Sequence, residues 1–153
     1  MTETQRDLKS ILKSRIGKGK IIILIGPRQV GKTTLFKSMI SEAGFLDTAQ
    51  YWNCDESDVR SMLTKESSAH FRPLIGKSKF IVIDEAQRVK NIGLILKILY
   101  ENFQDVQFAV TGSSSLDLSN TLNEPLTGRK FEYNLFPFST NELVHNSSML
   151  DEI

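Results

Sequence analysis

The stretch Gly26-Pro-Arg-Gln-Val-Gly31-Lys32-Thr33 decides how this chain is read, because it matches the phosphate-loop pattern G-x-x-x-x-G-K-[ST] at every fixed position. The apolar run before it, residues 21–25, has the composition of a buried strand, and residues 34–41 after it have a helical pattern. A phosphate loop works where a strand ends and a helix begins. The flanking segments therefore predict a phosphate-binding loop here, rather than a coincidental glycine-rich turn.

The residue types of this loop suit a bound nucleotide phosphate. Gly26 and Gly31 are expected to adopt backbone angles that a Cβ forbids, so that consecutive N–H groups point at an anion. We expect Lys32 to reach the β- and γ-phosphates and the Thr33 hydroxyl to ligate Mg²⁺. Arg28 either touches phosphate or faces solvent. The residues predicted to bind the nucleotide are Gly26, Pro27, Arg28, Gln29, Val30, Gly31, Lys32, Thr33 and Thr34.

Length and composition favour one globular domain over residues 1–153, with 40% hydrophobic and 24% charged residues. The net charge of +1 does not indicate a general nucleic-acid surface. Cys54 is the single cysteine, so no internal disulfide forms and a reducing compartment is expected. No apolar run approaches the ~20 residues of a membrane span, and the polar N-terminus does not resemble a signal peptide. We therefore expect a cytoplasmic protein that does not enter a membrane.

Strand and helix patterns alternate along the chain, which indicates an α/β fold with a parallel sheet. The apolar strands are near-continuous, as expected when helices cover both faces. Residues 113–128 are rich in Ser, Asn and Thr and are expected to form a mobile loop with room for a helical turn. The predicted strands are 20–25, 49–54, 79–84, 106–111 and 130–135, and the predicted helices are 3–15, 32–43, 57–66, 91–103 and 139–145.

A second motif follows the third predicted strand, where an apolar run ends in Asp84 and Glu85. Asp84 is expected to hold Mg²⁺ and Glu85 to orient or deprotonate an attacking water. Both carboxylates would lie at the carboxyl edge of the sheet, where ligands bind in open α/β folds. The alternative is an acidic helix start, which the phosphate loop upstream makes the weaker reading.

Two further segments supply candidate catalytic residues. Thr111 and Ser113 follow the fourth strand, and either hydroxyl is expected to bind the attacking water and sense the γ-phosphate, unless the segment is an ordinary turn. Arg129 follows Gly128 and is a candidate arginine finger, acting on its own nucleotide or a neighbour's, or else a surface residue. Asp55 either touches the site or caps a helix.

Together these segments resemble a known family. The motifs are Gly-Pro-Arg-Gln-Val-Gly-Lys-Thr-Thr-Leu (26–35), Ile-Asp-Glu-Ala-Gln (83–87), Thr-Gly-Ser-Ser-Ser (111–115) and Leu-Thr-Gly-Arg (126–129), followed by Leu-Phe-Pro-Phe-Ser (135–139) and Glu142. In this order they resemble the ATPase domain of a prokaryotic family in the AAA+ superfamily. Its members are known only as ATP-binding proteins and generally continue into a C-terminal domain of unknown function.

The resemblance implies a three-layer P-loop NTPase fold with strand order 5-1-4-3-2, and ATP and Mg²⁺ as ligands. It implies that Lys32 and Thr33 bind phosphate and Mg²⁺, that Asp84 supports the metal and that Glu85 is catalytic. Arg129 matches an arginine of the family that lies near the nucleotide. Because the sequence stops soon after Glu142, we expect a missing C-terminal domain or a neighbouring subunit, such as a second copy in a homo-oligomer, to complete the site.

Three functions follow from these patterns. The first is Mg-dependent ATP hydrolysis, in which water attacks the γ-phosphate under Glu85 and Arg129. The second is a nucleotide-gated interaction module that hydrolyses ATP slowly, as a timer. The third is a small-molecule kinase, which residues 113–128 are too few and too Ser-rich to support. A GTPase is disfavoured because the chain has no Asn-Lys-x-Asp guanine motif.

Overall fold

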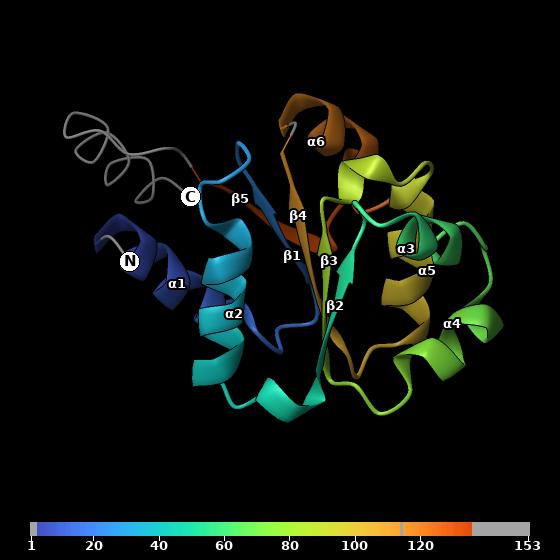
Figure 1. Cartoon of the computed structure of the whole chain (residues 1–153), viewed down its shortest axis with the longest axis horizontal. Helices are drawn as coiled ribbons and strands as arrows, with labels where there is room; N and C mark the ends of the chain where they lie inside the picture. The colour runs from blue at the N-terminus through green and yellow to red at the C-terminus, as the bar shows by residue number, and fades with distance from the viewer. Residues whose placement is uncertain (1–2, 114, 136–153) are drawn as a thin grey trace.

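A five-stranded parallel sheet with helices on both faces forms the fold in a computed structural model that describes residues 3–113 and 115–135 (Figure 1). The helices are α1 (Glu3–Arg15), α2 (Lys32–Glu42), α3 (Ser57–Met62), α4 (Ser68–Ile75), α5 (Ile92–Asn102) and α6 (Ser115–Asn123), with 3₁₀ turns η1 (Leu46–Thr48) and η2 (Ala86–Arg88). The strands are β1 (Ile21–Ile25), β2 (Ala49–Asn53), β3 (Phe80–Asp84), β4 (Gln107–Gly112) and β5 (Lys130–Asn134).

The strand order β2-β3-β4-β1-β5 confirms the predicted order, read from the opposite edge of the sheet. Every neighbouring pair is parallel; Ile22 of β1, for example, lies opposite Ala109 of β4 and Phe131 of β5. The carboxyl ends of all these strands therefore meet at one edge. That arrangement brings the phosphate loop after β1 beside the polar residues that end β3 and β4.

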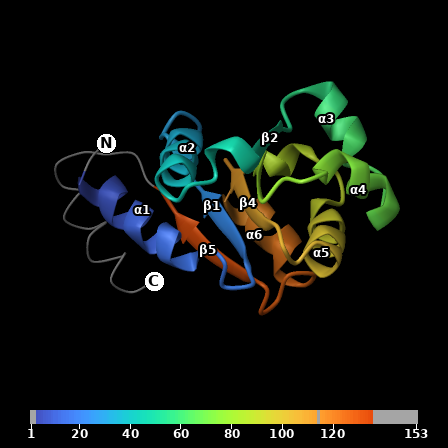
Figure 2. The same cartoon turned by 90° about the horizontal axis from the view of Figure 1, so that it is seen from below.

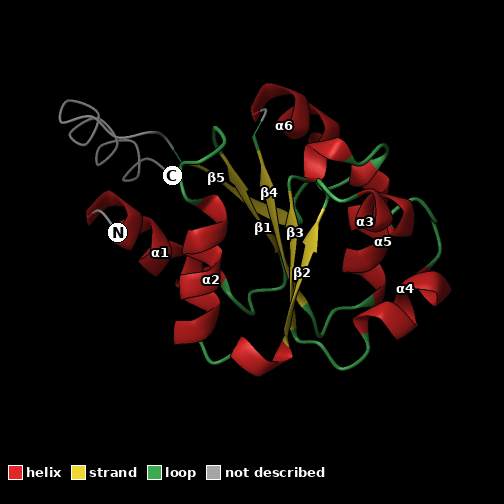
Figure 3. Cartoon of the chain, in the orientation of Figure 1, coloured by secondary structure: helices red, strands yellow, loops and turns green. Residues whose placement is uncertain are grey.

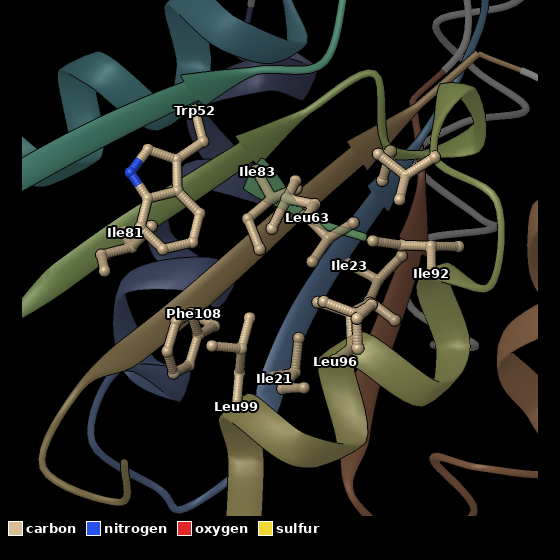
Figure 4. Close-up of a cluster of buried hydrophobic side chains, with 14 of the residues drawn as sticks. Ile21, Ile23, Trp52, Leu63, Ile81, Ile83, Ile92, Leu96, Leu99 and Phe108 are labelled. Carbon is tan, nitrogen blue, oxygen red and sulfur yellow. The ribbon is translucent and has the colours of Figure 1, made fainter. Parts of the chain in front are cut away.

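The helices form two layers, one on each face of the sheet (Figures 2 and 3). Ile22 and Leu24 of β1 point to the α1 and α2 side, where Leu8, Leu12 and Phe36 are buried. The alternating residues of β1 point to the other side, as expected for period-2 strands. Figure 4 shows this second core, where Ile21 and Ile23 meet Trp52, Phe108 and the α5 residues Ile92, Leu96 and Leu99. The predicted three-layer architecture is confirmed.

The sequence analysis missed one helix, α4, between α3 and β3. The predicted helix 57–66 ends at Met62, and α4 follows after a short turn, burying Phe71 and Ile75. Pro73, the sixth of the eight residues of α4, masks its helical pattern, because a proline there lacks the N–H that would bond to the Ala69 carbonyl.

A second correction concerns residues 113–128, which we predicted to be a mobile loop. Ser115–Asn123 form α6, and Leu118 and Leu122 are buried against the α5 side of the sheet together with Leu126. Their spacing of four places Leu118 and Leu122 on one face of α6, and Leu126 lies in the turn that follows the helix. The Ser- and Asn-rich composition obscured this pattern. The predicted helix 139–145 lies outside the described residues.

Candidate nucleotide site

The phosphate loop connects β1 to α2, and its own lysine forms hydrogen bonds to carbonyls at the start of the loop. Gly31 precedes α2 with φ of 92°, a left-handed angle that favours glycine, as predicted. The Lys32 ammonium is buried and donates hydrogen bonds to the carbonyls of Gly26 (2.7 Å) and Pro27 (2.8 Å). Burial lowers the pKa of Lys32, and the nearby carboxylates oppose that shift. An incoming phosphate would give this buried cation a compensating charge.

Gly26 is required for a different reason than predicted. It is not among the residues with a left-handed φ, so the expected forbidden backbone angle is absent at this position. Instead, a Cβ at Gly26 would lie 2.2 Å from the backbone oxygen of Leu135, which follows β5. The loop begins where two strand ends approach too closely for a side chain.

Three oxygen-bearing side chains meet between the loop and the end of β3. The Thr33 hydroxyl donates to Asp84 Oδ2 at 3.0 Å, and the Thr111 hydroxyl donates a very short hydrogen bond to Asp84 Oδ1. Adjacent ligands of an octahedral Mg²⁺ lie ~3.0 Å apart, given bonds of about 2.1 Å. The Thr33 and Asp84 oxygens therefore fit a shared Mg²⁺, with Thr111 holding the far carboxylate oxygen.

The placement of Thr111 differs from the expected sensor position. Its side chain is fully buried, and its oxygen also accepts a hydrogen bond from the Glu85 N–H (2.9 Å). Thr111 thus contacts the side chain of Asp84 and the backbone of Glu85 from the protein interior, and it does not line the hollow between the phosphate loop and the end of β3.

Glu85 follows β3 in the left-handed region, with φ of 56°. Such an angle is uncommon for a residue with a side chain and recurs at functional sites. The carboxylate is largely buried and turns toward the phosphate loop, with Oε1 3.9 Å from Lys32 Nζ and Oε2 3.6 Å from an Arg28 nitrogen. This orientation points Glu85 at the space that a nucleotide phosphate would enter.

Arg28 and Asp55 complete the rim of the site. The Arg28 guanidinium donates to both oxygens of Asp55 at 3.3 Å, and Arg88 contacts the same carboxylate at 3.2 Å. The hydrogen bond from Arg28 lowers the pKa of Asp55. Both residues line a hollow of about 310 Å³, and Glu56 rather than Asp55 is the N-cap residue of α3. The Arg28 side chain is half exposed, so its contact with phosphate stays a prediction. The lining of this hollow is Arg28, Gln29, Gly31, Lys32, Thr33, Thr34, Asp55, Asp84 and Glu85.

Gln87 is a site residue to which the sequence analysis gave no role. Its amide lies between Glu85 and Ser113, so Ser113 contacts the predicted base only through this side chain. The signal was present in the Asp-Glu-Ala-Gln motif, where a polar side chain two residues after Glu85 can turn back toward it.

Arg129 does not join this site. It precedes β5 at the amino edge of the sheet, where its carbonyl accepts a hydrogen bond from Ile21 N–H. Its guanidinium pairs with Glu101 at 2.9 Å and lies over the Tyr100 ring. Since five strand residues span ~16 Å, the fold separates Arg129 from its own phosphate loop.

A larger hollow, about 460 Å³, lies at that amino edge. It has no phosphate loop or carboxylate pair, and its Gln107 amide is already bonded to Gly17 N–H and the Lys20 carbonyl. The site is therefore assigned by its chemistry and not by its size.

Two aromatic residues of β2, Tyr51 and Trp52, lie on the strand next to β3. Trp52 is buried, and its ring stacks on Phe71 at 6.4 Å, so it packs in the core and does not face a nucleotide base. Tyr51 is partly exposed beneath Lys37. Within residues 3–113 and 115–135, no helix has both the length and the apolar character of a membrane span.

Comparisons with known proteins indicate the family of this chain. Residues 18–144 match the model of a family described as an AAA domain. Two uncharacterized proteins, from Mycobacterium bovis and Mycobacterium tuberculosis, are each 29% identical over 126 residues. The match covers 82% of this chain and 27% of each relative, so the chain spans about a quarter of their length.

Solved structures share the fold at low sequence identity. Drosophila ORC bound to DNA superposes with a TM-score of 0.62 at 16% identity, covering 93% of this chain and 96% of that one. The Thermotoga maritima RuvB Holliday junction branch migration motor gives 0.60 at 22% identity, covering 100% and 52%. These superpositions confirm the α/β fold expected from the motifs.

Proposed function

The chain belongs to the AAA domain family, and on that premise we propose that it binds Mg·ATP and hydrolyses it to ADP and phosphate. The observation that carries the proposal is the meeting of Lys32, Thr33, Asp84 and Glu85 around one hollow. A buried cation, a pair of metal-ligand oxygens and a carboxylate base are the parts that phosphoryl transfer to water requires.

Each side chain has a defined task in this mechanism. Lys32 would leave the Gly26 and Pro27 carbonyls to bind the β- and γ-phosphates, and Thr33 and Asp84 would hold the metal. Bound Mg²⁺ supplies charge neutralisation on the phosphate oxygens. Glu85 accepts a proton as water attacks the γ-phosphorus, and the bond to the bridging oxygen breaks to release ADP.

A nucleotide-gated switch with slow hydrolysis is the second candidate. The position of Arg129 favours it, because the expected arginine finger lies at the opposite edge of the sheet. In this case a neighbouring subunit, or a domain beyond the sequence, would supply the missing positive charge and set the rate. A homo-oligomer would place Arg129 of one copy against the nucleotide of the next.

Nucleotide binding is tested first by thermal stability. ATP with Mg²⁺ at about 100 times its dissociation constant is expected to stabilise the fold by about 2.7 kcal/mol. Lys32→Ala is expected to abolish this stabilisation. Lys37→Ala is the matched control, because Lys37 is an exposed lysine on the same helix. No stabilisation of the wild type, or an equal shift in Lys32→Ala, would refute the nucleotide site.

Hydrolysis is tested separately by phosphate release. Glu85→Gln is expected to bind ATP as the wild type does and to release phosphate about 10²–10⁴-fold more slowly. A wild type that binds ATP and releases none would reject the enzyme and leave the switch as the function. An unchanged rate in Glu85→Gln would remove Glu85 as the base.

A further inference from the structure

Gln87 lies in η2, two residues after the proposed base, and its side-chain amide makes three polar contacts. Its Nε2 donates to Glu85 Oε2 at 2.8 Å and to Ser113 Oγ at 2.8 Å. Its Oε1 accepts from the Ser113 N–H at 3.3 Å. One half-buried side chain thus joins the carboxylate after β3 to the backbone after β4.

The chemistry of these contacts fixes the orientation of the amide. A carboxylate oxygen only accepts hydrogen bonds, so the group facing Glu85 must be the NH₂ and not the carbonyl. The carbonyl then faces the only N–H in the set, on Ser113. Reversing the amide would place two acceptors together at Glu85 and two donors together at Ser113.

The other partners of Glu85 belong to the phosphate loop. Arg28 and Lys32 are cations 3.6 and 3.9 Å from its carboxylate oxygens. The phosphates of a bound nucleoside triphosphate would compete with Glu85 for both cations. Gln87 is neutral and lies on the same segment as Glu85. Of the three side chains that contact this carboxylate in the described part of the chain, Gln87 is the one that phosphate binding does not draw away.

The backbone around the contact is shaped to admit Gln87. A Cβ at Gly112, the last residue of β4, would lie 3.1 Å from Gln87 Oε1 and 2.2 Å from Leu118 Cδ2. Glu85 itself has a left-handed φ, a conformation that its neighbours must maintain. The closest approach at Gly112 is to Leu118, so only the strained backbone of Glu85 bears directly on the direction of the carboxylate.

We infer that Gln87 is a positioning residue that holds the Glu85 carboxylate toward the attacking water and couples it to the end of β4 at Ser113. The inference rests on the proposed hydrolytic function, because it assigns Gln87 a role through the base of that reaction. Gln87 itself does not touch the reacting atoms.

Steady-state phosphate release by the full chain tests the inference. Gln87→Ala is expected to lower kcat about 10- to 100-fold while the KM for ATP changes by less than about threefold, because the base is misdirected and the phosphate contacts remain. Ser113→Ala removes one of two contacts and is expected to lower kcat about 2- to 10-fold. Gln104→Ala, an exposed glutamine at the far edge, is expected to match the wild type.

A double variant separates positioning from general structural damage. If Gln87 acts through Glu85, adding Gln87→Ala to Glu85→Gln is expected to produce no further loss in single-turnover hydrolysis. A multiplied loss would show a role independent of the base and overturn the inference. If Gln87→Ala fails to fold, Gln87→Glu keeps the length but adds a second carboxylate beside Glu85, and its kcat is expected to fall at least as far.

The outcomes distinguish this inference from the function on which it rests. If Gln87→Ala keeps the wild-type rate, or raises KM with unchanged kcat, the positioning role of Gln87 is overturned and the proposed hydrolysis is not affected. A wild type that releases no phosphate overturns both hydrolysis and the positioning role. A lowered kcat with unchanged KM and no further loss in the Glu85→Gln background supports both.

Discussion

Gly26 is a single residue at which the phosphate loop and the sheet constrain each other. Its N–H donates to the Gly112 carbonyl at 3.0 Å, and Leu135 N–H donates to the Ile25 carbonyl at 2.7 Å. These bonds close the ends of β4, β1 and β5 around the first residue of the loop. The absence of a Cβ is therefore a packing requirement of three strands and not only a property of the loop.

Replacing Gly26 by alanine is expected to lower stability by about 3 kcal/mol or more, because the atom it meets is backbone and can move only with the end of β5. Urea unfolding without nucleotide measures this change. Gly44→Ala is the control, because Gly44 has open space around its Cα and only a left-handed φ to lose, at about 1–2 kcal/mol. Wild-type stability in Gly26→Ala would contradict the steric account.

The N-terminal helix α1 does not line the candidate site, but it contacts the phosphate loop. Lys9 and Lys13 both pair with Glu42 at the end of α2, while Leu8 and Leu12 are buried beneath them. The Gln5 amide of the same helix donates to the Val30 carbonyl in the phosphate loop at 3.2 Å. Docking α1 onto α2 therefore also positions part of the loop backbone.

The α1–α2 contact is expected to weaken in acid. The hydrogen bond from Lys9, followed by that from Ser38, lowers the pKa of Glu42 to about 2. A carboxyl with a depressed folded pKa stabilises the protein above its unfolded pKa of 4.5 and loses that contribution as pH falls toward 2. Thermal unfolding at pH 5 and pH 3 is therefore expected to show a smaller loss for Glu42→Gln than for the wild type, and an equal loss would contradict the pairing.

Helices differ in how far the sequence predicts them. The α5 pattern of Ile92, Leu96 and Leu99 is strong enough that the predicted range 91–103 differs from the observed one by one residue at each end. In α6 the same spacing of leucines is diluted by Ser and Asn, and its helix forms because the α5 side of the sheet buries it. Local propensity decided the first helix and tertiary burial decided the second.

At the scale of the whole molecule, the sheet has two chemically different edges. Lys32, Asp84 and Glu85 lie at the carboxyl edge, while Arg129 lies at the amino edge against Glu101 and Tyr100. Arg129 joins the start of β5 to α5, an exposed contact of small energetic value. Any role of Arg129 in hydrolysis therefore belongs to contact between molecules.

Arg129→Ala is expected to leave phosphate release per chain unchanged in dilute solution. If copies associate, the wild-type rate is expected to rise with protein concentration and the variant rate to stay flat. Phosphate release measured beside sedimentation distinguishes these cases, with Arg72→Ala as a control that also removes an arginine over an aromatic ring. Loss of turnover in a strictly monomeric variant would contradict the separation of the two edges.

The sequence alone determined the α/β class, the strands and the residues of the phosphate loop and the Asp84-Glu85 pair, because these depend on periodicity and on short motifs read along the chain. Only the tertiary structure decided which residues meet across strands. It buried Thr111 beneath Asp84, placed Gln87 between Glu85 and Ser113, and carried Arg129 to the opposite edge. Residues far apart in sequence acquire neighbours only when the sheet orders its strands, and no local pattern encodes that order.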